Sequence, residues 1–227
     1  MDIQTIKSIN LSGTYIPDSD AHDAGTCIDS IMGNLHLALV NYERYKDFLE
    51  KVPYRRFLDL AAVVRLDVTG ARYPVISNNF LNEFDITWEQ LYEKVLAYRQ
   101  ANTPYVFDSL TNVIKSLGTV DLDPAMDMPF LYLLTNQSLE FGSSVILYNG
   151  ICEDIYNKLG GEYVIIPANT NEVMIIPLDI DGSNSEYIKE IRKDVSEVNE
   201  FILKPEEFLS EGIYKYDSRK KQVELLN

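Results

Sequence analysis

Apolar residues recur at two different spacings along the chain, and each spacing predicts a different kind of element. Steps of three and four residues are typical of a helix with one buried face, whereas alternation or a short apolar run is typical of a strand. Helical steps between residues 28 and 49 predict one long N-terminal helix, which Pro53 ends. Residues 57–68 then predict a strand, with residues 73–76 as its hairpin partner.

Two capping boxes mark the starts of further helices. A Ser or Thr that precedes a Glu or Gln by three residues can exchange hydrogen bonds with it across the first helical turn. Thr87 with Gln90 and Ser183 with Glu186 fit this pattern, and an apolar stripe at helical spacing follows each pair. The remaining pattern predicts helices at 110–117 and 151–159, and strands at 130–135, 144–147, 163–166, 173–176, 213–216 and 223–225.

The order of these elements predicts the fold class. Several strands follow one another directly, which indicates an α+β fold with mainly antiparallel sheet and several packed helices. Residues 120–129 carry three aspartates and two prolines without periodicity, so we expect a boundary there. The predicted organisation is a polar segment at 1–25, a subdomain of helices and a hairpin at 26–119 and an α+β subdomain at 130–227, or else one continuous domain.

The charge of the chain restricts its partners. There are 35 acidic and 20 basic residues, a net charge of -15. Direct nucleic-acid binding depends on Lys and Arg residues that neutralise phosphates, and anionic membranes attract the same residues. We therefore expect binding neither to nucleic acid nor to a membrane. The acidic surface either serves solubility, docks a basic protein partner or mimics nucleic acid. No apolar run is long enough to span a membrane, and residues 1–10 do not resemble a signal peptide, so we expect a cytoplasmic protein.

Cysteine and histidine are too few to predict a cofactor or metal site. Cys27 and Cys152 lie far apart, and the histidines are His22 and His36, so a zinc cluster is not expected. The acidic run at residues 18–23 lacks the glycine and the distant glutamate of a calcium loop. Cys152 lies at a predicted helix start, where the helix dipole can lower a thiol pKa, although a structural role is favoured. Glycine-rich nucleotide motifs are absent, and we expect no cofactor.

Two groups of polar residues are the candidates for a functional site. Strand alternation places Arg55 and Asp59 on one face and Arg56 on the other. The arginines either form an ion pair at this corner, with Asp59 largely buried, or act as an anion-binding fork. A second group lies at strand ends, where it either lines a polar groove or stabilises turns; its members are Asn136, Asn169, Asn171 and Glu172.

Several short segments share a family pattern. They include residues 53–66, 76–81, 88–92, 131–136, 142–150, 160–167 and 213–217. Together they resemble an uncharacterised bacterial family catalogued as domain of unknown function 5688. The resemblance implies a shared fold and no assigned activity. Relatives carry histidine where this chain has Tyr54 and Asn171, so a site that requires either histidine would be absent here.

These observations favour a cytoplasmic, non-enzymatic protein-interaction module over two alternatives. The first alternative is an enzyme that uses carboxylates with Arg55 or Arg56 on a small molecule. The second is an acidic inhibitor that mimics nucleic acid. A focused acidic face would favour the inhibitor, and a pocket with converging Arg, Asn and Glu would favour the enzyme.

Overall fold

The chain forms two compact units, each built from an antiparallel sheet and helices. The computed structural model describes residues 28–67, 74–116, 130–178, 186, 188–190, 192–193, 197, 204 and 207–226. The units are Met1–Asn102 and Thr103–Asn227. The fold is therefore α+β with antiparallel sheet, as the order of elements predicts.

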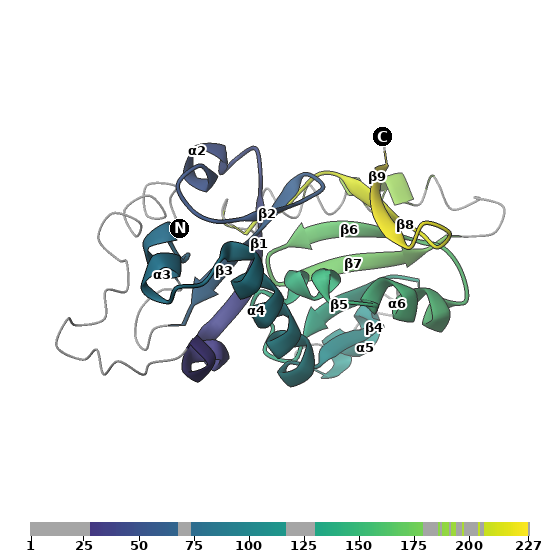
Figure 1. Cartoon of the computed structure of the whole chain (residues 1–227). Coiled ribbons are helices and arrows are strands. Elements are labelled where there is room, and N and C mark those ends of the chain that lie inside the picture. The colour runs from purple at the N-terminus through teal and green to yellow at the C-terminus, as the bar shows by residue number, and fades with distance from the viewer. Residues whose placement is uncertain are drawn as a thin grey trace. The chain divides into compact units, whose positions relative to one another are not determined.

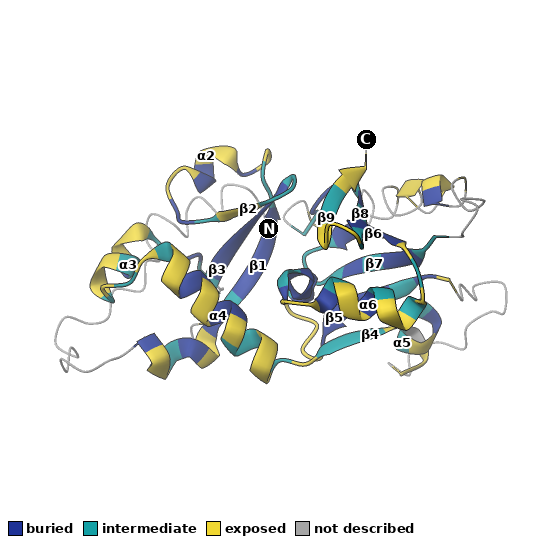
Figure 2. Ribbon diagram, turned by 45° about the vertical axis from the view of Figure 1, so that its right-hand side comes forward, coloured by how far each residue is buried: buried dark blue, intermediate teal, exposed yellow. Residues whose placement is uncertain are grey.

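The first unit contains a three-stranded sheet with strand order β1-β3-β2 (Figure 1). Helix α4 covers one face of this sheet (Figure 2). The elements in chain order are η1 (Ile28–Asn34), β1 (Leu35–Asn41), α2 (Lys46–Leu49), β2 (Arg55–Phe57), β3 (Leu60–Leu66), α3 (Asn78–Glu83) and α4 (Trp88–Asn102).

Helix α4 begins at the predicted capping box. The backbone N–H of Thr87 donates to Gln90 Oε1 over 3.0 Å, and the N–H of Gln90 donates to Thr87 Oγ1 over 3.2 Å. Both hydrogen bonds satisfy donors that a helix start leaves open. The predicted stripe is buried, with at most 4% of each residue exposed; its members are Leu91, Tyr92, Val95 and Leu96.

The long helix predicted over residues 28–49 is wrong. A 3-10 helix, a strand and a single turn of α-helix occupy this stretch instead. Strand β1 pairs with β3 from Leu35 opposite Leu66 to Asn41 opposite Leu60. Its side chains are buried on both faces, so the apolar run has no alternation, and periodicity cannot distinguish such a strand from a buried helix. His36 therefore lies on a strand.

The strand predicted over residues 57–68 is confirmed over Leu60–Leu66, which form β3, whereas Phe57 ends a separate strand, β2. Strands β2 and β3 pair antiparallel on either side of a two-residue turn at Leu58 and Asp59. The pairing predicted with residues 73–76 is confirmed where it is described, because Val75 bridges Arg65 and Leu66 N–H donates to the Pro74 carbonyl over 2.9 Å, but the contact is an isolated bridge and not a named strand. Residues 68–73 lie outside the described part of the chain.

The second unit contains a six-stranded antiparallel sheet with strand order β4-β5-β7-β6-β8-β9 (Figure 1). The elements in chain order are β4 (Tyr105–Ser109), α5 (Leu110–Ser116), β5 (Tyr132–Asn136), η3 (Gly142–Leu147), α6 (Ile151–Leu159), β6 (Tyr163–Asn169), β7 (Glu172–Pro177), β8 (Ile213–Asp217) and β9 (Gln222–Leu226). Helix α5 thus belongs with this unit, whereas the sequence analysis includes its residues in the first subdomain, and strand β4 is an element that the sequence analysis does not predict.

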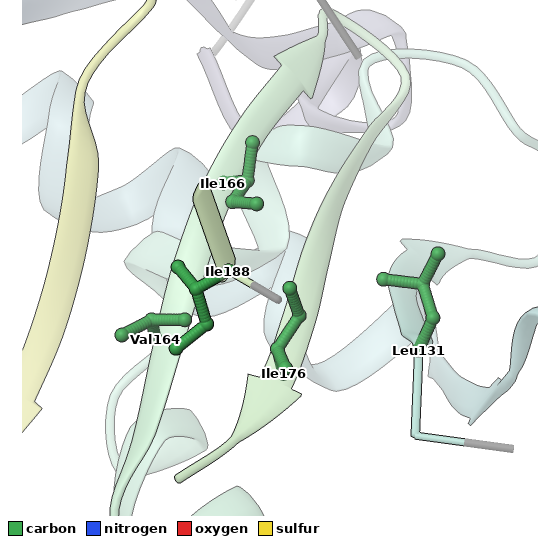
Figure 3. Close-up of a cluster of buried hydrophobic side chains, with 5 residues drawn as sticks. All are labelled: Leu131, Val164, Ile166, Ile176 and Ile188. Atoms are coloured by element: carbon green, nitrogen blue, oxygen red, sulfur yellow. The ribbon is translucent and has the colours of Figure 1, made fainter. Parts of the chain in front are cut away.

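Strand β6 is buried on both faces of this sheet. One face carries Tyr163, whose hydroxyl donates to the Cys152 carbonyl of α6 over 2.9 Å. The other face carries Val164 and Ile166, which pack with Ile176 and with the helical residue Ile188 (Figure 3). Ile188 belongs to the apolar stripe predicted behind the second capping box, but Ser183 of that box lies outside the described residues.

The sequence pattern identifies most elements of the second unit correctly. Helix α6 and the strands of the β6–β7 and β8–β9 hairpins are confirmed. Gly160, with φ of 74°, ends α6 in the left-handed conformation that glycine adopts without strain. The strand predicted at 144–147 is wrong, because the 3-10 helix η3 occupies it. The boundary predicted at 120–129 lies outside the described residues.

Candidate functional site

The predicted site residues divide between the two units. Arg55, Arg56 and Asp59 belong to the first unit, where two arginines and three tyrosines form what we call the arginine–tyrosine cluster: Tyr42, Tyr54, Arg55, Arg56 and Tyr92. The other four belong to the second unit, and we call them the asparagine turn cluster: Asn136, Asn169, Asn171 and Glu172.

Arg56 is an exposed side chain that two contacts hold in place. Its Cζ atom lies 3.3 Å from the centroid of the Tyr42 ring, a cation–π arrangement. Its Nε donates to the Leu58 carbonyl over 2.5 Å. The Tyr42 ring lies 5.9 Å from that of Tyr54, and a hydrogen bond with Tyr42 raises the pKa of the Tyr54 hydroxyl. The guanidinium of Arg56 is therefore oriented on the protein surface.

Arg55 points to the opposite face of β2, toward helix α4. Its Nη1 lies 2.8 Å from Glu93 Oε1, and its Cζ lies 4.6 Å from the Tyr92 ring centroid. The side chains of Arg55 and Glu93 are 56% and 59% exposed. The sequence analysis expects an ion pair with Asp59 at this corner, but the carboxylate that contacts Arg55 comes from a helix 38 residues further along the chain.

Asp59 occupies the turn between β2 and β3 and is half-buried. Its carbonyl accepts a hydrogen bond from the Tyr42 N–H over 3.1 Å. The preceding residue, Leu58, has φ of 56°, which is unfavourable for a side chain of this size. The alternation expected through this stretch ends at this turn, so the strand argument does not place Asp59 on the face of Arg55.

Asn136 stabilises a loop of the second unit through side-chain hydrogen bonds. The residue is 6% exposed. Its Nδ2 donates to the Glu140 carbonyl over 2.8 Å, and its Oδ1 accepts from Ser138 Oγ over 2.9 Å. This loop also contains Leu139 and Phe141, whose φ angles are 57° and 51°. Asn136 thus supports a backbone that bulky residues would otherwise avoid.

The remaining asparagines close the turn between β6 and β7. Asn169 Oδ1 accepts from the Asn171 N–H over 2.8 Å, and Asn169 Nδ2 donates to Glu172 Oε1 over 3.1 Å. Asn171 Oδ1 accepts from the Phe141 N–H over 3.3 Å, which joins this turn to the neighbouring loop. The structure therefore brings all four members of the asparagine turn cluster to one end of the sheet, with their amides bonded inside the chain.

Three residues that the sequence analysis does not single out complete this end of the sheet. Thr135 Oγ1 donates to the Asn171 carbonyl over 2.6 Å, and Ser143 Oγ donates to the Thr170 carbonyl over 2.7 Å. A Cβ on Gly142 would lie 2.1 Å from Thr135 Oγ1 and 2.2 Å from the Asn171 carbonyl. Only glycine fits this close approach, and no sequence motif indicates it.

The Cys152 thiol has the properties of a structural residue. It lies in the first turn of α6, where the sequence analysis considers a lowered pKa. Burial instead raises the pKa of Cys152 to about 11, and a hydrogen bond with Tyr163 offsets the effect only in part. The thiol is therefore protonated at neutral pH, and the thiolate needed for nucleophilic attack is scarce.

A buried tyrosine and arginine of the first unit are a second feature that the sequence analysis does not identify. Tyr45 is 5% exposed, and its buried hydroxyl has no hydrogen-bond partner among the described residues. Burial raises the pKa of Tyr45 and lowers the pKa of Arg65, to about 10. Arg65 remains protonated at neutral pH, so a positive charge lies in the electrostatic environment of this hydroxyl.

The described ranges hold neither a metal-binding cluster nor a membrane-spanning helix. Nowhere in them do three His, Cys, Asp or Glu side chains come close enough to hold a metal ion. Each helix there is too short or too polar to cross a bilayer.

Comparison with known proteins places the chain in a family. A search of curated proteins gave no match, and a search of solved structures gave none either. The model of a family of unknown function, DUF5688, matches residues 10–218. This match spans both units, and it agrees with the family that the short segments resemble. The chain therefore belongs to this family of unknown function.

Proposed function

We propose that the protein is a non-enzymatic protein-interaction module that contacts its partner through the arginine–tyrosine cluster. One observation carries this proposal: the exposed guanidinium groups of Arg55 and Arg56 each stack on a tyrosine ring. Tyrosine, tryptophan and arginine dominate the binding energy of protein interfaces. Strand β2, which carries both arginines, is an outer strand of its sheet.

The stacking also lowers the cost of binding. A free arginine side chain carries about 2 kcal/mol of rotamer entropy, much of which is lost when a partner immobilises it. Arg56 is already held by the Tyr42 ring and the Leu58 carbonyl, so less entropy remains to be lost on association. Preorganised side chains of this kind favour a role in binding.

The second unit supports a binding role over an enzymatic one. The asparagine turn cluster uses its amide groups within the chain, which leaves fewer groups to act on a substrate. The Cys152 thiol is protonated at neutral pH, and His36 lies on β1 of the first unit. We therefore place the activity of this cytoplasmic protein in recognition, with a partner whose overall charge is basic, because a net charge of -15 attracts it.

Site-specific photo-cross-linking in the native host tests the proposal. Glu50, whose charge acts on Tyr54, is exposed and carries the benzophenone amino acid without removing a cluster side chain. Exposed Arg219, in the turn after β8, carries it in a matched control. We expect a discrete protein adduct from position 50 only, and its loss in the Arg55→Ala/Arg56→Ala variant.

Folding of that variant is checked by circular dichroism before the adducts are compared. The absence of an adduct at position 50, or the same adducts at both positions, would overturn the proposal. An adduct that survives the double substitution would also overturn it, because the contact would then not depend on the arginines.

A further inference from the structure

The guanidinium of Arg56 offers an open fork of hydrogen-bond donors. Its Nε is bonded to the Leu58 carbonyl, but no described residue accepts a hydrogen bond from Nη1 or Nη2. Arg55 differs, because its Nη1 is bonded to Glu93. The two neighbouring arginines therefore differ in one respect that matters for a ligand: only Arg56 lacks a carboxylate partner among the described residues.

The fork is held in a defined orientation. The Tyr42 ring, 3.3 Å from Cζ, supports the guanidinium plane, and the Leu58 carbonyl holds its inner edge. This carbonyl belongs to a turn in which Leu58 keeps a φ of 56°. A non-glycine residue in such a conformation is strained and persists only where its surroundings hold it. The outer edge of the guanidinium, with Nη1 and Nη2, is thus presented at an exposed surface.

We propose that Arg56 binds a carboxylate of the partner protein through Nη1 and Nη2, an inference that rests on the proposed function. The planar fork of an arginine matches the two oxygens of a carboxylate, and such bidentate pairs are stronger than neutral hydrogen bonds. The Glu50 carboxylate acts on Tyr54 beside the fork, and the whole chain carries -15. This field repels a phosphate with nearly two charges more than a carboxylate with one, so the carboxylate is favoured.

Arginine side-chain NMR of the full-length protein tests the inference. Sodium chloride is replaced stepwise by sodium acetate at constant ionic strength, and Arg56→Lys and Arg55→Lys variants assign the guanidinium signals. We expect the Arg56 signal to shift and saturate at millimolar acetate, while the Arg55 signal stays in place because Glu93 occupies its fork. Glu50→Gln should move the Arg56 midpoint to lower acetate, since a repelling charge is removed.

Each other result counts against the inference. An Arg56 signal that does not saturate, or that moves in parallel with Arg55, overturns it. Inorganic phosphate that saturates Arg56 at lower concentration than acetate also overturns it, because the fork would then select phosphate.

Comparison with the cross-linking experiment separates this inference from the proposed function. If the adduct at position 50 requires the arginines but acetate does not saturate Arg56, the inference fails and the proposed function stands. If acetate saturates Arg56 but no adduct forms, the proposed function fails, and with it the assignment of the carboxylate to a protein partner.

Discussion

The arginine–tyrosine cluster of the first unit and the asparagine turn cluster of the second both bond within the chain, but they differ in how far their polar groups stay exposed. Asn136 and Asn171 bond to backbone groups of neighbouring loops. Arg55 and Arg56 bond and stack within the chain as well, yet both remain exposed. The first group can still take a partner, whereas the second is used to hold the fold.

For Asn136, which is 6% exposed, the difference follows from burial. A buried amide must find its partners inside the protein, because an unsatisfied buried polar group costs about 1–3 kcal/mol. An exposed guanidinium can leave donors to water and later exchange water for a ligand. Polar residue type therefore identifies candidate sites in a sequence, but the degree of burial decides whether the groups are available.

Substitution of Gly142 should have the largest effect. Its Cβ would lie 2.1 Å from Thr135 Oγ1 and 2.2 Å from the Asn171 carbonyl, so the loop and the hairpin must move apart. We expect Gly142→Ala to lower the free energy of unfolding by about 3 kcal/mol, the range of severe overpacking. Gly161→Ala is the matched control, because a Cβ there meets nothing within 4 Å, and urea titration of both variants measures the difference. Equal stabilities would contradict the packing of this corner.

Loss of the Asn136 amide should have the next largest effect. Asn136→Ala leaves the Glu140 carbonyl and the Ser138 hydroxyl without their partner, so we expect a loss of about 1–3 kcal/mol. Asn102→Ala removes an amide hydrogen bond of the same length, 2.8 Å to the Tyr98 carbonyl, at an exposed site. Thermal unfolding should separate the two variants clearly, and a similar fall in both would show that burial is not the deciding factor.

High pH should destabilise the second unit through Cys152. Its pKa is raised by burial from 9.0 to about 11, so between these values the unfolded chain loses a proton that the folded chain keeps. The free energy of unfolding should therefore fall as pH rises, by about 1 kcal/mol between pH 9 and 10. Tyr163, whose pKa burial also raises, acts in the same direction at higher pH. Unfolding of Cys152→Ser should show a smaller slope over this range, and an unchanged slope would contradict the assignment.

The exposed arginines should contribute least to stability. A double-mutant cycle of Arg55→Ala and Glu93→Ala should give a coupling of about 0.2–1 kcal/mol, because the pair is exposed and salt screens it. Arg56→Lys should leave the free energy of unfolding within about 0.5 kcal/mol of the wild type. A loss as large as that of Asn136→Ala would mean that the arginines hold the fold, and the contrast between the two clusters would disappear.

Local signals in the sequence predicted many elements correctly. One physical reason applies to all of these signals: each acts between residues that are close in the chain. Thr87 and Gln90 exchange hydrogen bonds within one helical turn, and Gly160 ends α6 by its own conformational freedom. Such signals depend on residues a few positions apart, so no knowledge of the fold is needed. The candidate site residues were chosen by residue type and stay a prediction, and the partner of Arg55, 38 residues away on α4, could not be found in this way.

The sequence by itself determined the helix caps, the hairpins of the second unit, the acidic charge and the membership of a family of unknown function. Only the tertiary structure decided that Leu35–Asn41 is a strand, because its pairing with Leu60–Leu66 satisfies the backbone groups that a helix would otherwise satisfy internally. It also decided that Gly142 has to be glycine and that Glu93 of a distant helix is the ion-pair partner of Arg55. Burial and long-range pairing arise between segments distant in the chain, so a local pattern cannot contain them.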